Sequence, residues 1–132
     1  MDDAERTIIV DAANVVGSRP DGWWRDRAGA ARRLLDGLAA LRTRLPETTS
    51  LIVVLEGAAK AAADGTEYEG VRIVLAAGSG DDTIVEVTAT ELETACPPRE
   101  VTAVTADRGL RARVEPLGAS TLGPSWLLSQ LP

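Results

Sequence analysis

The chain of 132 residues has no histidine and a single cysteine, Cys96. Without histidine there is no Ser-His-Asp triad, no Cys-His pair and no His-ligated metal site. One cysteine excludes an internal disulfide and a cysteine-rich zinc site. Cys96 precedes two prolines at the expected end of a helix, where it is best explained as a small, partly buried apolar residue. Carboxylates are therefore the groups left for catalysis.

Aromatic residues are also scarce, with no phenylalanine and one tyrosine, so the core must be built from aliphatic side chains. Hydrophobic residues make up 45% of the sequence, an ordinary share for a globular protein. The length fits one compact domain with a real core. We expect residues 1–132 to form a single domain.

Long apolar runs are missing as well. None approaches the roughly 20 residues that span a bilayer, and residues 1–7 lack the basic and then apolar pattern of a signal peptide. We therefore expect a cytoplasmic protein without membrane contact. The formal net charge of −6 argues against a wide, nonspecific nucleic-acid-binding surface. It does not exclude a nuclease, because a metal site needs clustered acids and a bound cation reverses the local field.

Apolar, β-branched runs alternate with helical patterns along the chain. Strands are expected at residues 7–11, 50–55, 71–76, 101–106 and 119–122, and helices at 24–45, 58–63, 81–95, 108–117 and 126–131, with a loop at 17–22. The run at 50–55 is apolar on both faces, as in a central parallel strand. The alternation predicts an α/β fold whose mostly parallel sheet carries helices on both faces.

Acidic residues follow several of these strands, where sheets of this kind bind their ligands. They are Asp11 after the first strand, Glu56 after the second, Asp81 and Asp82 after the third, and Asp107 after the fourth. If the first and fourth strands are neighbours, Asp11 and Asp107 lie side by side. Clustered carboxylates repel one another unless a cation neutralises them, and hard oxygen ligands suit Mg²⁺ or Mn²⁺. The pattern indicates a metal site able to hydrolyse a phosphodiester.

Each acid also has a structural alternative. Ser79 and Asp82 match a capping box, and acids in the first turn of a helix complement its dipole. Asp107 fits a plain N-cap. For each acid by itself, the structural role is favoured over a catalytic one. Because the acids occur together at strand ends, a metal site is as well supported as these structural roles.

Four segments, in order, resemble NYN domains, a branch of the PIN-like nucleases. Residues 8–16, Ile-Ile-Val-Asp-Ala-Ala-Asn-Val-Val, are similar to the opening strand and Asp-x-x-Asn signature of these domains, and residues 53–57 to the strand, acid and glycine that follow. Residues 78–86 resemble the Ala-Asp-Asp-x-Ile-x-Glu stretch of the bacterial YacP type, and residues 104–110 its Val-Thr-Ser-Asp-Arg-x-Leu stretch. Gly118 and Ala119 match the small residues before the last strand.

The resemblance implies a three-layer α/β/α sandwich with sheet order 3-2-1-4-5, and a metal-dependent ribonuclease that uses Mg²⁺ or Mn²⁺. The metal ligands that it implies are Asp11, Asp81, Asp82 and Asp107. Asn14 is implied as the residue that orients water or phosphate. Glu56 stands where the bacterial domains often have aspartate, which leaves its role open, and Glu86 is expected behind the ligands, one helical turn after Asp82.

Arginines and tryptophans follow the Asn14 loop, a combination that can hold phosphate and stack a base. The candidates for RNA contact are Arg19, Trp23, Trp24, Arg25 and Arg27. The alternative is that one tryptophan packs against the sheet and the arginines are solvated. Arg108, directly after Asp107, either pairs with the acids or contacts a phosphate.

Other functions stay open. One is a catalytically weak or inactive PIN-like module that binds RNA or the ribosome, and another is a toxin-type ribonuclease. A phosphatase with an aspartyl nucleophile fits less well, because Ala13 and Asn14 depart from its Asp-x-Asp-x-Thr pattern. The expected partner is RNA, presented by a ribosome or a protein partner, and a homodimer is compatible with the sequence. The sequence does not specify the RNA target, the choice between endo- and exonuclease action, or the preferred metal.

Overall fold

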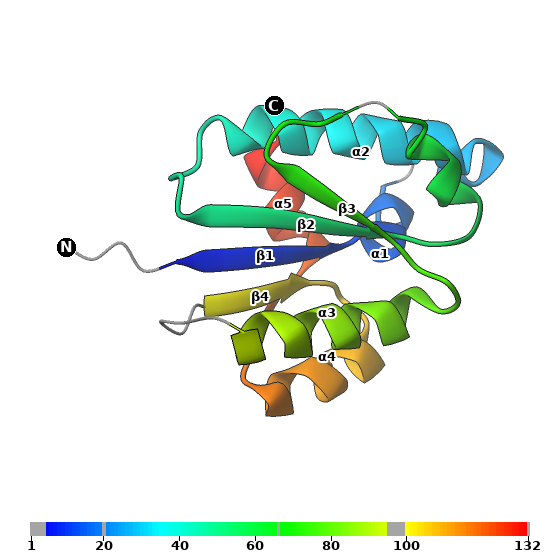
Figure 1. The fold of residues 1–132 in the computed structure, drawn as a ribbon. Helices are drawn as coiled ribbons and strands as arrows, with labels where there is room; N and C mark the ends of the chain where they lie inside the picture. The colour runs from blue at the N-terminus through cyan, green and yellow to red at the C-terminus, as the bar shows by residue number, and fades with distance from the viewer. Residues whose placement is uncertain (1–4, 20, 66, 95–99, 132) are drawn as a thin grey trace.

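The computed structural model describes residues 5–19, 21–65, 67–94 and 100–131, and these form a five-stranded parallel sheet between helices (Figure 1). The strands are β1 (Arg6–Asp11), β2 (Thr49–Leu55), β3 (Val71–Leu75), β4 (Glu100–Val104) and β5 (Ser120–Leu122). Their order is β3-β2-β1-β4-β5, and every pair is parallel. The predicted α/β fold and its sheet order 3-2-1-4-5 are confirmed.

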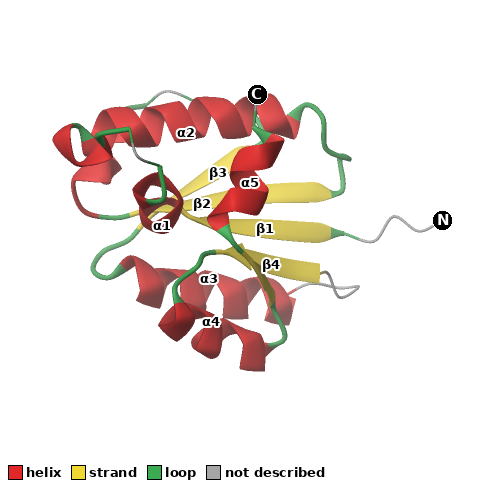
Figure 2. Cartoon of the chain, turned by 180° about the vertical axis from the view of Figure 1, so that it is seen from behind, coloured by secondary structure: helices red, strands yellow, loops and turns green. Residues whose placement is uncertain are grey.

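Helices cover both faces of this sheet. The α-helices are α1 (Ala12–Gly17), α2 (Arg27–Arg42), α3 (Gly80–Thr94), α4 (Arg108–Val114) and α5 (Pro124–Gln130). Short 3₁₀ helices span Trp23–Arg25, Gly57–Ala62 and Glu115–Leu117. Figure 2 shows α2 and α5 on one side of the sheet, α3 and α4 on the other, and α1 at the end of the strands opposite the N-terminus. None of the helices in the described ranges has the length and apolarity of a membrane span.

Successive residues of β1 belong to different cores, because side chains alternate between the faces of a strand. Ile8 and Val10 pack on the side of α2, whereas Ile9 packs on the side of α3 and α4. All three are essentially inaccessible to solvent. β1 is therefore the middle strand of the sheet and contributes side chains to both cores. This packing fixes the position of Asp11 at its end.

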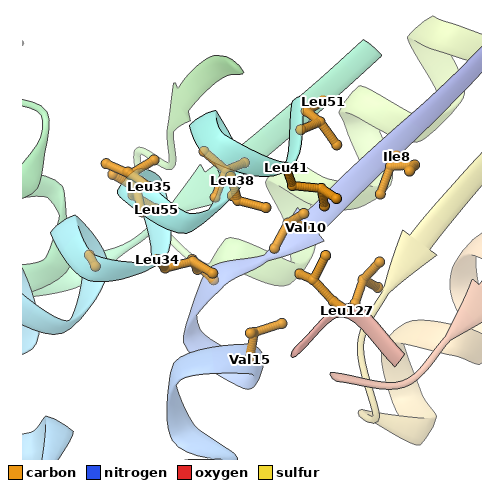
Figure 3. Packing of buried hydrophobic residues seen from close by; sticks show 14 of the residues in the cluster. Ile8, Val10, Val15, Leu34, Leu35, Leu38, Leu41, Leu51, Leu55 and Leu127 are labelled. Atoms are coloured by element: carbon orange, nitrogen blue, oxygen red, sulfur yellow. The ribbon is translucent and has the colours of Figure 1, made fainter. Parts of the chain in front are cut away.

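The core under α2 is aliphatic, as the composition predicted. The helix presents leucines at helical spacing, and Figure 3 shows them among side chains of β1 and β2, with Leu127 of α5 close to Val10. These are Leu34, Leu35, Leu38, Leu41 and Leu127, all buried. Full burial of such a side chain contributes about 1.5–3 kcal/mol relative to exposure, so this cluster holds α2 and α5 against the sheet.

Some boundaries differ from the sequence prediction. Helix α2 begins at Arg27 rather than Trp24, because Asp26 has a non-helical backbone (φ −152°, ψ 80°) and its Oδ1 accepts from Gly29 N at 2.8 Å as an N-cap. At its other end α2 stops at Arg42, three residues before the predicted Leu45. The prediction that residues 17–22 directly follow the first strand as a loop missed α1. Cys96 lies outside the described residues.

Strand β4 also ends at Val104, two residues earlier than predicted. Beyond it, Ala106 N donates to the side chain of Asn14 instead of to a neighbouring strand. The chain therefore leaves the sheet just before Asp107, and it does so at the point where β1 also ends.

Candidate active site at the carboxyl edge of the sheet

Asp11 is the last residue of β1 and is only 6% exposed. Its Oδ1 accepts from Asn14 N at 3.3 Å, which caps the short helix α1. Its Oδ2 accepts from Thr105 Oγ1 at 2.9 Å, across to the residue that follows β4. One carboxylate oxygen is thus held by the first turn of α1 and the other by the residue that follows β4.

Burial raises the pKa of Asp11 to about 6. The hydrogen bonds from Thr105 and Asn14 act in the opposite direction, because they favour the charged form. The negative charges of Asp81 and Glu56 raise the pKa further. Asp11 is therefore a carboxylate whose charge is poorly compensated by the protein around it.

Thr105 joins the ends of β1 and β4, and sequence reasoning did not single it out. Its hydroxyl donates to Asp11 Oδ2 and accepts from Asp107 N at 3.1 Å. Since the hydroxyl has one proton, the donor direction is fixed by these two partners. The signal available in the sequence was its place two residues before Asp107, within the Val-Thr-Ala-Asp stretch that resembles the YacP type.

Asn14 lies on α1 with its side chain turned toward the end of β4. Its Oδ1 accepts from Ala106 N at 2.8 Å, which fixes the orientation of the carboxamide. No described residue accepts from the amide NH₂ of Asn14, and Asn14 is one of the residues that line an open hollow of about 550 Å³, with Trp23, Ala106 and Ser125. The amide can therefore donate to a ligand at this edge.

Glu56 reaches from the end of β2 to the beginning of α3. Its Oε2 accepts from Gly80 N at 3.1 Å. A Cβ at residue 80 would lie 2.7 Å from Glu56 Oε1, so glycine is what allows this close approach. The role that the sequence left open for Glu56 thus includes capping α3, while its charge adds to the negative field at Asp11.

Asp81 and Asp82 begin α3 and point to different partners. Asp81 is partly buried; burial raises its pKa, and so do the charges of Asp107, Glu56 and Asp82, against a lowering effect of Arg113. The side chain of Asp82 is 65% exposed, and its Oδ1 lies 2.9 Å from Arg113 Nη2 of α4. The structure therefore brings Asp81 to the other acids and turns Asp82 toward an arginine that sequence reasoning missed.

The capping box around Asp82 is only partly present. Asp82 N donates to Ser79 Oγ at the long distance of 3.4 Å. Glu86, one turn further along α3, is exposed. Neither observation shows that the side chain of Asp82 or Glu86 caps helix α3.

Asp107 is exposed and directly precedes α4. Its Oδ1 accepts from Leu110 N at 3.0 Å, which is the N-cap that the sequence offered as a structural alternative. Its charge also raises the pKa of Asp81. Asp107 therefore has a capping role and a place among the acids at the same time.

We name Asp11, Glu56, Asp81 and Asp107 the acid cluster. Within the described ranges, no three acidic or cysteine side chains stand close enough to enclose a metal ion by themselves. The oxygen-only donor set still fits Mg²⁺ or Mn²⁺, because Mg²⁺ is commonly held by one or two carboxylates and keeps several waters. The uncompensated charge of Asp11 and Asp81 is what such an ion would neutralise.

The two neighbouring tryptophans differ in their surroundings. Trp23 is partly buried, with the guanidinium of Arg27 5.4 Å from its ring centroid, whereas Trp24 is 55% exposed with Arg25 at 5.8 Å. The rings meet edge to face at 6.0 Å. Sequence reasoning offered packing or RNA contact for this segment, and the structure gives Trp23 a partly packed position and leaves Trp24 at the surface.

Arg108 directly follows Asp107, yet it does not pair with the acids. It is exposed and makes no ion pair with any described residue. Arg19 is partly buried after α1, and its backbone N donates to Val16 O. The arginine that does reach an acid at this edge is Arg113, through Asp82.

The fold has known counterparts among solved structures. The crystal structure of Rae1 (YacP) from Bacillus subtilis is similar with a TM-score of 0.77 and 18% identity, over 98% of this chain and 73% of that chain. Its W164L mutant gives a TM-score of 0.73 and 16% identity, over 95% and 74%. No protein-family model matches the sequence, and no curated protein does. Identities this low show a shared fold alone, so the chain has a YacP-like α/β fold with the acid cluster at the carboxyl edge of its sheet.

Proposed function

We propose that this chain is a metal-dependent ribonuclease that hydrolyses RNA phosphodiester bonds at the acid cluster. One observation carries the proposal. Acids from the ends of β1 and β2, the start of α3 and the N-cap of α4 gather at one edge, where burial and the neighbouring negative charges raise the pKa values of Asp11 and Asp81. Such repulsion destabilises a fold unless a cation offsets it.

In this proposal one or two of Asp11, Asp81 and Asp107 would bind Mg²⁺ or Mn²⁺ directly, and the remaining carboxylates, Asp82 among them, would bind the waters that the ion keeps. When bound, the ion polarises a phosphoryl oxygen and lowers the pKa of its water. Asn14 donates its amide NH₂ to a phosphate oxygen, because its carbonyl oxygen is already engaged by Ala106 N.

RNA as the substrate is supported by the resemblance to NYN domains and by the YacP-like fold. The net charge of −6 bears on how RNA reaches the site. A net negative charge repels the phosphate backbone, so phosphate contacts add little affinity for free RNA. We therefore propose that a ribosome or a protein partner presents the RNA.

The test is cleavage of single-stranded RNA by purified protein with Mn²⁺ or Mg²⁺. Wild type should cut, EDTA should stop it, and Asp11→Asn should lose most activity. Asp36→Asn is the matched control, since it makes the same chemical change at an exposed position of α2 away from the acid cluster. Equal activity of Asp11→Asn and Asp36→Asn points to a contaminating nuclease or a site elsewhere.

The main alternative is an inactive module that binds RNA or the ribosome. Because the net charge makes naked RNA a poor substrate, the same assay is repeated on RNA bound to ribosomes. Failure of folded, metal-bound wild type to cut either substrate favours the binding module over the ribonuclease.

A further inference from the structure

A hollow of about 310 Å³ lies next to the acid cluster, and we call it the Trp23 pocket. Small apolar side chains of α1 and α2 line it, together with the indole of Trp23 and the guanidinium of Arg27. Ala12, which follows Asp11, and Glu56 of the acid cluster are also part of its wall. The pocket therefore opens directly beside the groups proposed to act on the phosphodiester.

The shape and chemistry of the wall suit a flat aromatic group. Ala12, Ala13 and Val16 offer a low apolar surface, and Trp23 adds an aromatic ring. Small-molecule sites occupy roughly 300–1,000 Å³, so this volume is at the lower end and fits one nucleotide-sized group, not a stacked duplex. Base stacking on aromatic side chains is how unpaired nucleic acid is commonly held.

The charge beside the pocket suits a phosphate. Arg27 is the first residue of α2, where the helix dipole disfavours a cation, and the acid beside it, Asp26, is engaged in capping the helix. Neither Arg27 nor Arg25 forms an ion pair with any described residue, although Arg32 and Arg33 of the same helix pair with aspartates. The Arg27 guanidinium lies over the Trp23 ring at 5.4 Å and has no acidic partner among the described residues, so its charge is available to an external anion.

We propose that the Trp23 pocket takes one unpaired nucleobase of an RNA strand, which stacks on the Trp23 indole while Arg27 binds the adjoining phosphate. That the strand is RNA follows from the proposed ribonuclease function, on which this inference rests. The acid cluster then acts on the phosphodiester next to the seated base. A paired base reaches the pocket only after leaving its stack, at a cost of a few kcal/mol, so the substrate class is single-stranded RNA.

The pocket is tested by binding in EDTA, where no cleavage interferes. Three probes of equal length are compared: a single-stranded oligoribonucleotide, its abasic counterpart with the same phosphates, and its duplex. Wild type should bind the base-bearing single strand about tenfold more tightly than either other probe. Trp23→Leu should lose this preference for bases and leave the affinity for the abasic strand within about twofold.

Two further variants keep the test decisive if Trp23→Leu folds poorly. Ala13→Leu fills the pocket from an exposed position of α1 and keeps a good helix former, so it should also abolish the preference for bases. Arg27→Gln should lower the affinity for both single-stranded probes, base-bearing and abasic, several-fold. Arg33→Gln, on the same helix and outside the pocket, makes the same charge change and should alter neither. Circular dichroism confirms that each variant is folded.

Equal binding of base-bearing and abasic strands by wild type overturns the proposal, as does a preference that survives in both Trp23→Leu and Ala13→Leu. Lack of binding to any probe overturns it too. Cleavage assays on the same preparations separate the two proposals. If wild type cuts RNA and the variants keep the preference, only the pocket assignment fails; if the variants abolish the preference and wild type cuts no RNA, only the ribonuclease proposal fails.

Discussion

The carboxylate of Asp11 is held between the first turn of α1 and the residue that follows β4, and its burial raises its pKa to about 6. From about pH 4 to pH 6 the folded protein keeps a proton that the unfolded chain has released. The free energy of unfolding therefore falls as the pH rises through this window. Above it, the whole destabilisation caused by the buried, ionised carboxylate of Asp11 is present. A shift of about two units corresponds to roughly 2–3 kcal/mol.

Asp11→Asn should consequently stabilise the metal-free protein at neutral pH. The amide carries no charge, and its oxygen can still accept a hydrogen bond in this place. At pH 7.5 in EDTA we expect the free energy of unfolding to rise by about 1–2 kcal/mol. At pH 4.5, where Asp11 itself is protonated, the difference should shrink to less than about 0.5 kcal/mol. Urea unfolding at both values measures it, and a destabilisation that does not depend on pH contradicts this account of Asp11.

Thr105 gives a second prediction at this scale, because its hydroxyl is buried and serves Asp11 and Asp107 together. Thr105→Val keeps the shape and removes both hydrogen bonds, so it should lower the free energy of unfolding by about 1–3 kcal/mol. Thr105→Ser keeps the hydroxyl and should lose about 1 kcal/mol or less. Urea unfolding compares the two; a serine variant as unstable as the valine variant would show that the methyl group, not the hydroxyl, matters here.

Single acids were predictable from the sequence where they end a strand. Asp11 and Asp107 stand out because an acid follows an apolar run, whereas a threonine near a strand end looks like any other strand residue. The bond from Thr105 to Asp11 spans 94 residues, so it exists only once β1 and β4 are paired. The contact of Glu56 with Gly80 likewise depends on how α3 is placed against β2.

At the scale of elements, the first turn of α3 directs the side chains of two adjacent aspartates to different sides. Consecutive helical residues point about 100° apart, since a turn holds 3.6 residues. Asp81 therefore faces Asp107 and Glu56, while Asp82 faces Arg113 of α4. The pair of Asp82 and Arg113 is largely exposed, so its contribution to stability is small.

This orientation predicts unequal effects for the same chemical change. Asp81→Asn should lower RNA cleavage about a hundredfold or more, the size of effect that loss of one electrostatic contact in an active site produces. Asp82→Asn should lower it less, by about tenfold, the low end of what loss of a partner behind the metal ligands costs. Steady-state cleavage with Mn²⁺ compares the two variants with wild type. A larger loss in Asp82→Asn than in Asp81→Asn would show that Arg113 releases Asp82 to serve as the principal ligand.

Element boundaries were less predictable than element types. The pattern of apolar residues continues through Trp23 and Trp24, so the sequence extended α2 backwards past its real cap at Asp26. Helix α1 is only six residues long, too short to show helical periodicity. β4 was predicted too long because the bond from Ala106 N to Asn14 is tertiary and leaves no local trace.

For the whole molecule, strand and helix alternation predicts the α/β class but leaves the order of the strands open. The order 3-2-1-4-5 was implied by the resemblance to NYN domains, and β1 in the centre bears it out. The sequence named Trp23 and Arg27 as candidates for RNA contact, but it did not predict the pocket, because the wall combines α1, α2, the end of β2 and the 3₁₀ helices beside them.

Metal binding should couple to the stability of the whole fold. An ion that binds only the folded protein stabilises it by about 2.7 kcal/mol at a hundred times its Kd. We expect Mn²⁺ or Mg²⁺ to raise the Tm of wild type by several degrees. Asp11→Asn should respond less, and Asp36→Asn should respond as wild type does. Equal responses of Asp11→Asn and wild type in thermal unfolding would remove Asp11 from the metal site.

Asp107 combines a structural and a proposed catalytic role in one side chain, which makes Asp107→Asn informative. Asparagine keeps the size of the side chain and caps helices as well as aspartate does, so the variant should unfold within about 0.5 kcal/mol of wild type. The lost charge should lower cleavage of single-stranded RNA in Mn²⁺ about a hundredfold or more. Unfolding and cleavage are measured on the same preparation. A folded Asp107→Asn that cuts RNA at the wild-type rate contradicts the placement of a ribonuclease centre at the acid cluster.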